Sequence, residues 1–236
     1  MPRRIFLVGT DTEAGKTAVA AALLRHARGA GARVLPFKPA ASGGDDPERL
    51  VAAAGLDPEL LPRIAPLRYD PPLAPGIAAD RLAFVAPARG PEAAAIAARG
   101  AAQIAAVAAG LAALEAELRP TLTIIEGAGG WHVPMPGGTW LPAWVDALDA
   151  AVVVVGRLGL GTINHTLLTI DALRGAGHSP LGFILSATVA ADDPSTRDNP
   201  EIIAQARGLP LLGLLARDAA TIELRDGAWE RLLGAA

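Results

Sequence analysis

The sequence predicts an α/β fold in which helices flank a doubly wound, mainly parallel sheet. Short apolar runs of strand length alternate with longer alanine-rich or amphipathic segments along the whole chain. Glycine-rich or polar segments follow four of these runs, and the strand ends of such a sheet meet at one edge. The 236 residues carry one continuous pattern, so we expect a single domain over residues 1–236.

The first predicted strand is Ile5–Val8, four apolar residues without a polar interruption. Gly9–Thr17 follows it, and the alanine-rich run Ala18–Ala27 has the composition of a helix. A strand, a glycine loop and a helix beginning with Gly-Lys-Thr form a phosphate-binding loop. In such a loop Lys16 reaches the outer phosphates and the hydroxyl of Thr17 can bind Mg²⁺. Five residues separate the two glycines instead of the usual four, so we expect a variant P-loop and a P-loop NTPase-like fold.

Arg33–Phe37 is predicted to be the second strand, and Lys38–Gly44 a loop that leaves it. Asp45–Glu48 has the capping residue, proline and acidic first turn that start a helix, so Asp46 can be a cap, a ligand or both. The proline-rich stretch Leu61–Pro91 is expected to be irregular. A loop of that length is either a lid or binding segment, or a plain surface connection.

The rest of the chain continues the alternation of helices and strands. The predicted elements are a helix over Pro91–Leu118, strands at Thr121–Ile125 and Ala151–Val155, a helix that opens within Gly159–Asn164 and runs to about Ala176, a strand at Leu181–Leu185, a helix over Pro200–Arg207, a strand at Leu211–Leu215 and a short helix within Gly227–Ala236.

Composition and charge exclude several classes of protein. A net charge of −3 argues against binding to duplex nucleic acid. No apolar run approaches the ~20 residues that span a bilayer, and the N-terminus lacks the features of a signal peptide. The absence of cysteine excludes disulfides and fits a reducing compartment. We therefore expect a soluble, cytoplasmic protein with neither nucleic-acid nor membrane partners.

Lysine occurs at only two positions, Lys16 and Lys38, whereas the other 19 of the 21 basic residues are arginine. A coding bias explains the arginines, but it does not explain why both lysines follow predicted strands near the phosphate loop. A compact ammonium on a flexible stem serves functions that a planar guanidinium cannot. Both lysines are therefore expected to belong to the site.

Polar or glycine-rich segments at four predicted strand ends are expected to converge. They are Gly9–Thr17, Lys38–Asp46, Glu126–Gly130 and Gly156–Asn164. Thr17, Asp46 and Glu126 offer three hard oxygen atoms, which suit Mg²⁺ held together with substrate phosphates. A carboxylate buried at the end of an apolar strand, as Glu126 is, needs a cationic partner such as a metal ion or a substrate amine.

Four sequence blocks occur in a characteristic order. They are GTDTEAGKT at 9–17, KPAASG at 38–43, EGAGGW at 126–131 and LGTINHTLLT at 160–169. Together they resemble the dethiobiotin synthetase family over residues 1–185, although the first part of the fourth block matches less closely than its Asn-His core.

The resemblance implies an ATP-dependent ring closure in biotin biosynthesis. In that family CO₂ is joined to 7,8-diaminopelargonic acid, which gives dethiobiotin, ADP and phosphate through a carbamate that ATP phosphorylates. The implied partners are the diamine, CO₂ or bicarbonate, ATP and Mg²⁺. A homodimer is also implied, because the family binds the carboxylate tail of the substrate across the subunit interface.

The resemblance also assigns roles to matching positions. It implies that Lys16, Lys38 and Thr12 are catalytic. Nucleotide contacts are implied for Glu13, Ala14, Gly15, Lys16, Thr17, Ala18, Glu126, Gly129 and Ser186. Substrate contacts are implied for Thr12, Lys38, Ser42, Gly161, Thr162, Ile163 and Asn164, the last four at a helix N-terminus that suits a carboxylate. Metal ligands are implied at Thr17, Asp46 and Glu126, with Asp45 adjoining Asp46 as an alternative.

Two positions depart from the family pattern. Many relatives have an asparagine near Ser186 that reads adenine, and a proline near Ala216. A serine hydroxyl matches a base edge less completely than an amide, which offers both a donor and an acceptor. We therefore expect other nucleoside triphosphates to replace ATP with little loss.

Three other functions compete with this one. A nucleotide-switch ATPase of the partitioning or metallocentre-assembly type often has a second lysine in its phosphate loop, where this chain has Thr10 and Thr12. An amidoligase of corrinoid synthesis normally brings a glutaminase domain with a cysteine, and this chain has no cysteine. The third is a nucleotide-binding dimerisation module without catalysis.

Overall fold

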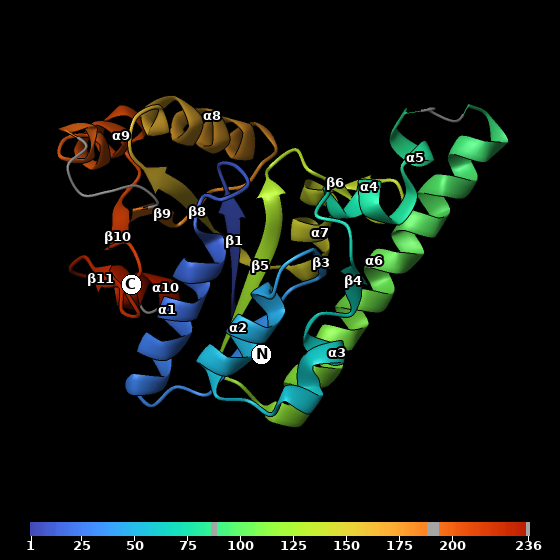
Figure 1. Cartoon of the computed structure of the whole chain (residues 1–236), viewed down its shortest axis with the longest axis horizontal. Coiled ribbons are helices and arrows are strands. Elements are labelled where there is room, and N and C mark those ends of the chain that lie inside the picture. The colour runs from blue at the N-terminus through green and yellow to red at the C-terminus, as the bar shows by residue number, and fades with distance from the viewer. Residues whose placement is uncertain (86–88, 188–193, 235–236) are drawn as a thin grey trace.

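A seven-stranded sheet with helices on both faces forms the architecture (Figure 1), as given by a computed structural model that describes residues 1–85, 89–187 and 194–234. The strand order is β11-β10-β9-β8-β1-β5-β2, and the pairs are parallel except for β10 with β11. The predicted doubly wound, mainly parallel sheet is therefore confirmed. The strands are β1 (Arg3–Gly9), β2 (Val34–Phe37), β5 (Leu122–Gly130), β8 (Ala151–Leu158), β9 (Gly182–Ala187), β10 (Leu211–Leu215) and β11 (Glu223–Leu224).

The core consists of two hydrophobic layers, one on each face of the sheet. Alternate side chains of β1 enter different layers, with Ile5 and Leu7 in one and Phe6 and Val8 in the other. The first layer is covered by α1 (Lys16–Gly29), α2 (Asp46–Ala54) and α10 (Ala228–Leu233). The second is covered by α6 (Pro91–Leu118), α7 (Leu141–Leu148), α8 (Thr162–Gly175) and α9 (Asn199–Arg207).

Most predicted elements lie within a few residues of the observed ones. The helix predicted over Pro91–Leu118 and the strand predicted at Leu211–Leu215 have those bounds in the structure. The strand β5 is longer than predicted, because it continues beside β1 through the glycines that follow Glu126. The predicted C-terminal helix is α10, and residues 235–236 lie outside the described residues.

Two segments expected to be irregular contain regular structure. Within the loop expected at Lys38–Gly44, β3 (Ala40–Ser42) pairs in parallel with β4 (Leu67–Tyr69), and this pairing joins positions too distant in sequence for a local pattern to indicate. Prolines lie in the first turn of two short helices in the stretch 61–91, where proline favours a helix. The additional elements are η1 (Pro58–Leu60), α3 (Leu61–Ile64), α4 (Pro75–Asp80), α5 (Leu82–Val85), β6 (Pro134–Met135), β7 (Thr139–Trp140) and η2 (Pro194–Thr196).

The register between β1 and its neighbours fixes the position of the candidate site. Leu7 pairs with Glu126 on β5, and Phe37 at the end of β2 pairs with Ile125. The strands are parallel, so the segments after β1, β2 and β5 leave the sheet at the same edge. Phe37 and Ile125 are paired, so the residues that follow them, Lys38 and Glu126, lie close together.

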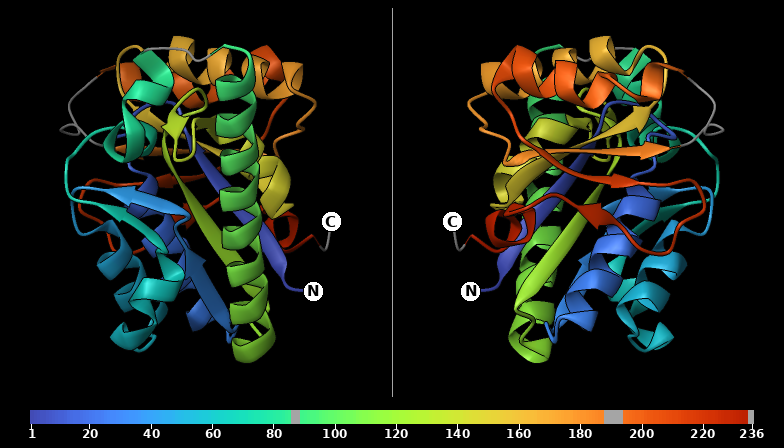
Figure 2. Two further views of the ribbon diagram at one scale, coloured as in Figure 1. Left: turned by 90° about the vertical axis from the view of Figure 1, so that its right-hand side faces the viewer. Right: turned by 90° about the vertical axis from the view of Figure 1, so that its left-hand side faces the viewer.

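The helix α6 is long and apolar enough to cross a membrane by length and composition, with a mean hydropathy of 1.5 in its most apolar window. The expectation that no segment approaches this limit is wrong, because the many alanines raise the hydropathy without forming a run of large apolar side chains. In the structure, Ile104, Val107, Leu111 and Leu114 pack into the core. The helix lies along the sheet (Figure 2).

A buried ionic network ties α6 to the edge of the sheet opposite the candidate site. Glu115 accepts two hydrogen bonds from Arg4, at 3.0 and 2.6 Å, and a third from the hydroxyl of Thr123 at 2.8 Å. Arg4 also donates to the backbone oxygen of Leu148 at 2.9 Å. This network therefore joins β1, β5, α6 and the end of α7.

Replacing Glu115 with alanine should destabilise the protein by about 3 kcal/mol, because the change leaves the partly buried guanidinium of Arg4 without its charged partner and the buried hydroxyl of Thr123 without its acceptor. The measurement is the midpoint of urea unfolding. Glu117→Ala is the matched control, since it breaks an ion pair with Arg63 that lies in water, and its midpoint should stay at the wild-type value. Equal midpoints for the two variants would contradict the structural role of the network.

Candidate active site

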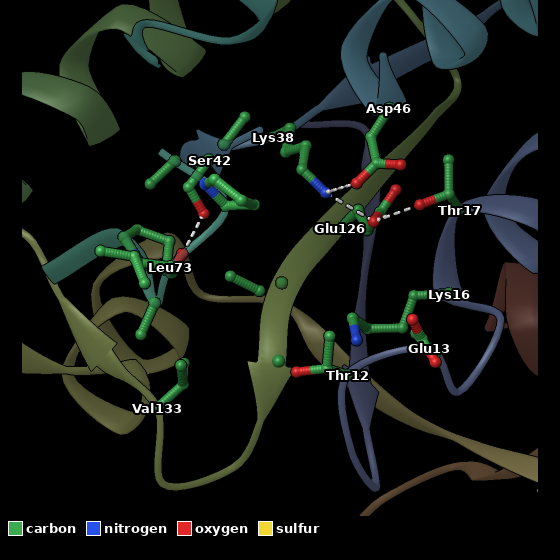
Figure 3. A pocket seen from close by; sticks show the side chains of 18 of the residues that line it. Thr12, Glu13, Lys16, Thr17, Lys38, Ser42, Asp46, Leu73, Glu126 and Val133 are labelled. Atoms are coloured by element: carbon green, nitrogen blue, oxygen red, sulfur yellow. Dashed lines mark hydrogen bonds and ion pairs between the residues drawn. The ribbon is translucent and has the colours of Figure 1, made fainter. Parts of the chain in front are cut away.

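A cavity of about 500 Å³ opens at the edge of the sheet where β1, β2 and β5 end (Figure 3). It is lined by the phosphate loop, by the segment that follows β2, by the first turns of α1 and α2, by the end of β5 and by residues 72–75. The sequence-predicted residues among its walls are Thr12, Glu13, Gly15, Lys16, Thr17, Ala18, Lys38, Ser42, Asp46, Glu126 and Gly129.

The phosphate loop needs glycine at two positions, Gly9 and Gly15. A side chain at Gly9 would place its Cβ 2.7 Å from both the Nζ of Lys16 and the backbone oxygen of Gly129. Gly15 precedes α1 with φ +87°, in the left-handed region that favours glycine. The first turn of α1 borders the cavity, and the unpaired N–H groups at a helix N-terminus favour an anion.

Lys16 is buried at the start of α1, and its Nζ donates to the backbone oxygen of Asp11 at 3.0 Å. Burial lowers the pKa of this ammonium to about 8, and the attraction of Glu126 offsets the shift only in part. Nearby Lys38 lowers the pKa of Lys16 further by repulsion. Lys16 is thus a cation whose charge is poorly compensated by the protein, which suits it to bind phosphate.

The second lysine belongs to a compact polar cluster of side chains from three elements. The Nζ of Lys38 lies 2.6 Å from the Oε1 of Glu126 and 3.1 Å from the Oδ2 of Asp46. The hydroxyl of Thr17 donates to the same Oε1 at 2.8 Å. We call Thr17, Lys38, Asp46 and Glu126 the carboxylate cluster, and Figure 3 shows its members pointing toward one another.

Opposite charges favour the ionised forms of Lys38 and Asp46, although Lys38 is buried and Asp46 is partly buried. Burial disfavours the charged form of Lys38, but Glu126 and Asp46 outweigh burial and raise the pKa of Lys38. Burial likewise opposes ionisation of Asp46, and Lys38 more than offsets it, so the pKa of Asp46 is lowered. Asp46 is the first residue of α2, and the N-cap position belongs to Asp45, which makes no side-chain capping bond.

The oxygen atoms of the carboxylate cluster fit a magnesium ion. Glu126 is 1% exposed, and its Oε2 is a buried atom without a hydrogen-bond partner among the described residues. Such an atom is a ready ligand for a cation. The described part of the chain has no group of three or more His, Cys, Asp or Glu side chains that could hold a metal alone. Two carboxylates and a hydroxyl instead suit Mg²⁺ shared with nucleotide phosphates.

Residues 72–75 and Ser42 form the wall opposite the phosphate loop. The hydroxyl of Ser42 donates to the backbone oxygen of Leu73 at 2.5 Å. Behind this wall, Gly76 packs directly on the backbone of residues 134–135, where a Cβ would lie 2.6 Å from the backbone oxygen of Met135. Residues 72–75 of the long proline-rich stretch therefore border the cavity, which agrees with a binding segment better than with a plain surface connection.

Several predicted site residues lie outside the cavity walls. Ala14 is buried beneath the phosphate loop, and Ser186 is buried in β9 between β8 and β10. Gly161 precedes α8, and the Thr162 hydroxyl faces that of Thr166 at 3.3 Å inside the core. The segment Gly161–Asn164 therefore does not reach the cavity of its own subunit, and its predicted role stays a prediction.

The structure adds wall residues that the sequence did not suggest. Arg49 lies one helical turn after Asp46 on α2. This spacing puts both residues on one face of the helix, so it could have indicated Arg49 from the sequence. Val133 follows β5 and borders the cavity, whereas Trp131 and Trp144 are core residues and Trp140 is largely exposed. No sequence pattern indicated Val133, because it comes from an irregular segment.

The sheet order, the phosphate loop and the adjoining carboxylate cluster define a P-loop nucleotide-binding protein. Solved structures agree at the level of the fold. The chloroplast FtsY of Physcomitrella patens gives a TM-score of 0.59 at 15% identity, over 100% of this chain and 65% of that one. The FtsY of Thermotoga maritima gives 0.56 at 17% identity, over 99% and 69%.

Within this class, the chain belongs to the dethiobiotin synthetase family. It is 39% identical to the ATP-dependent dethiobiotin synthetase BioD of Anaeromyxobacter sp. strain Fw109-5, over 98% of each chain. It is 34% identical to the corresponding protein of Chromohalobacter salexigens, over 91% of this chain and 90% of that one. A family profile described as an AAA domain matches residues 3–223.

The lowered pKa of Lys16 predicts that nucleotide affinity falls at alkaline pH. Phosphate binds the charged ammonium, which loses its proton above about pH 8 in the free protein. Relative to pH 7, affinity for ADP should therefore be about twofold lower at pH 8 and about tenfold lower at pH 9. Isothermal titration calorimetry measures this. Lys16→Arg keeps its charge, so its affinity should not change over this range. An equal decline in both proteins would assign the effect to another group.

Proposed function

We propose that this protein closes the urea ring of dethiobiotin from 7,8-diaminopelargonic acid, CO₂ and ATP, with release of ADP and phosphate. One observation carries the proposal. The only two lysines of the chain and two carboxylates, one from α2 and one from β5, border one cavity in a chain 39% identical to an ATP-dependent dethiobiotin synthetase. A cytoplasmic location remains a prediction of the sequence.

The nucleotide is bound by the phosphate loop and the start of α1. The loop amides and Lys16 hold the β- and γ-phosphates, and residues Glu13 to Ala18 surround them. Thr17, Asp46 and Glu126 would hold Mg²⁺, as the unpartnered Oε2 of Glu126 supports. When bound, this ion neutralises charge on the phosphates during transfer.

The reaction needs no nucleophile from the protein. A neutral amine of the diamine attacks CO₂ and forms a C–N bond, which gives a carbamate. A carbamate oxygen then attacks the γ-phosphorus, and the bond to ADP breaks. Finally the second amine attacks the carbonyl carbon, closes the ring and displaces phosphate. The protein contributes positioning and charge. Lys38 and Thr12 face the carbamate and the phosphoryl group, and Ser42 lies beside the diamine.

The substrate tail is bound by a second subunit. Gly161 and Asn164 are exposed at the start of α8 and do not line the cavity of their own chain. Helix N-termini attract carboxylates. A homodimer that brings Gly161, Thr162, Ile163 and Asn164 of one subunit to the cavity of the other would complete the site.

Phosphate release tests the proposal and separates it from the alternatives. With ATP and Mg²⁺, release should require both diaminopelargonate and bicarbonate and should match dethiobiotin formed, measured by mass spectrometry. Lys38→Met should lower this rate at least a thousandfold, because the carbamate loses its cationic partner. Glu117→Gln, a change at an exposed ion pair, is the control and should keep the wild-type rate. Phosphate release without the diamine would favour a nucleotide-switch ATPase.

Relaxed nucleotide choice is proposed from the two departures noted in the sequence. Ser186 pairs with Leu215, the last residue of β10, so Ala216 leaves that strand beside Ser186. A hydroxyl discriminates less between base edges than an amide. We expect kcat/KM for CTP and GTP within a hundredfold of the value for ATP, and Ser186→Asn should widen the gap. A stronger preference of the wild-type enzyme for ATP would contradict this.

A further inference from the structure

Lys38 occupies the place between two carboxylates where a metal ion would be expected. Its Nζ is 2.6 Å from Glu126 and 3.1 Å from Asp46. The Thr17 hydroxyl donates to the oxygen of Glu126 that Lys38 contacts, the Oε1. The Lys38 ammonium therefore contacts two of the three oxygen-bearing side chains that suit Mg²⁺, and the third, Thr17, is bonded to the same oxygen of Glu126 (Figure 3).

Two cations cannot share this point. Mg²⁺ binds oxygen at 2.0–2.1 Å and demands a nearly octahedral shell. An ion held by Thr17, Asp46 and Glu126 would fall within a few ångströms of the present position of the ammonium, because Lys38 already contacts both carboxylates. At that separation, and with Lys38 only 3% exposed, the repulsion between the two charges would be poorly screened.

We propose that Lys38 and Mg²⁺ bind the carboxylate cluster alternately, so that entry of the metal moves the Lys38 ammonium into the cavity. This inference rests on the proposed function for the presence of Mg²⁺. The cavity of about 500 Å³ provides the space, because Lys38 lines it together with Thr12, Ser42 and Gly129. Lys38 is the first residue after β2, and its flexible stem can swing without a backbone change.

The exchange would link two binding events in a fixed order. While Lys38 is paired with Glu126 and Asp46, its charge is compensated and is not available to an anionic substrate. After the metal takes over both carboxylates, the ammonium loses its partners and gains affinity for the carbamate and the phosphoryl group. Metal–nucleotide binding therefore prepares the cavity for the carbamate, which is a positive coupling between the two sites.

The first test uses the fact that the chain contains only two lysines. Protein labelled with ¹³Cε,¹⁵Nζ-lysine gives two side-chain signals, which Lys38→Arg and Lys16→Arg assign. ADP with a chelator should shift the Lys16 signal and leave Lys38 nearly unchanged. Subsequent addition of Mg²⁺ should then shift Lys38. A Lys38 signal that stays in place, while Mg²⁺ binding to the complex is detected calorimetrically, would overturn the proposal.

The second test measures affinity for Mn²⁺ alone by electron paramagnetic resonance. If Lys38 competes with the metal, Lys38→Met should bind Mn²⁺ about tenfold more tightly than the wild type. Lys16→Met is the matched control, because it also removes a buried ammonium from the cavity. The described contacts of this ammonium include no hydrogen bond to a carboxylate. Its affinity should rise much less. Unchanged or weaker binding by Lys38→Met would show that Lys38 does not compete.

These readouts separate this inference from the proposed function. Dethiobiotin formation with a Lys38 signal that ignores Mg²⁺ would overturn the exchange and leave the activity standing. A metal-dependent Lys38 shift without dethiobiotin formation would overturn the activity and keep the exchange. If Lys38→Met does not fold, the labelled wild-type protein still decides the question.

Discussion

The register between β1 and β5 is the constraint on which the site depends. Pairing of Leu7 with Glu126 places a carboxylate beside the phosphate loop, and the pairing of Phe37 with Ile125 brings Lys38 to the same point. Side chains alternate between the faces of a strand, so a slip by one residue would turn Glu126 away from Lys38 and Thr17. The apolar residues of both layers hold this register, because the same slip would expose them.

The buried charges of the site depend on one another, because the loss of one would leave its partner buried and unpaired. Lys38 and Glu126 are almost completely buried, and each carries a charge that needs the other. Lys16, in contrast, has only a backbone oxygen of Asp11 as its hydrogen-bond partner in the described structure. The two lysines therefore differ in kind. One is neutralised by the protein, and the other is left for a ligand with negative charge.

Much of this architecture was predictable from the sequence, because strand–helix alternation and the GTDTEAGKT block are local signals. The rarity of lysine indicated Lys38 even without a motif. The pairing of β3 with β4 was not predictable, since it depends on contacts between residues 40–42 and 67–69. For the same reason the sequence could not distinguish Asp45 from Asp46. Only the folded chain shows that Asp46 reaches Lys38 while Asp45 precedes the helix.

The close packing of Gly76 on Met135 bears on how the substrate enters. Opening this wall of the cavity would require the main chains at Gly76 and Met135 to separate, which close packing opposes. A substrate would then enter past the rest of the lining, which includes the phosphate loop and Val133.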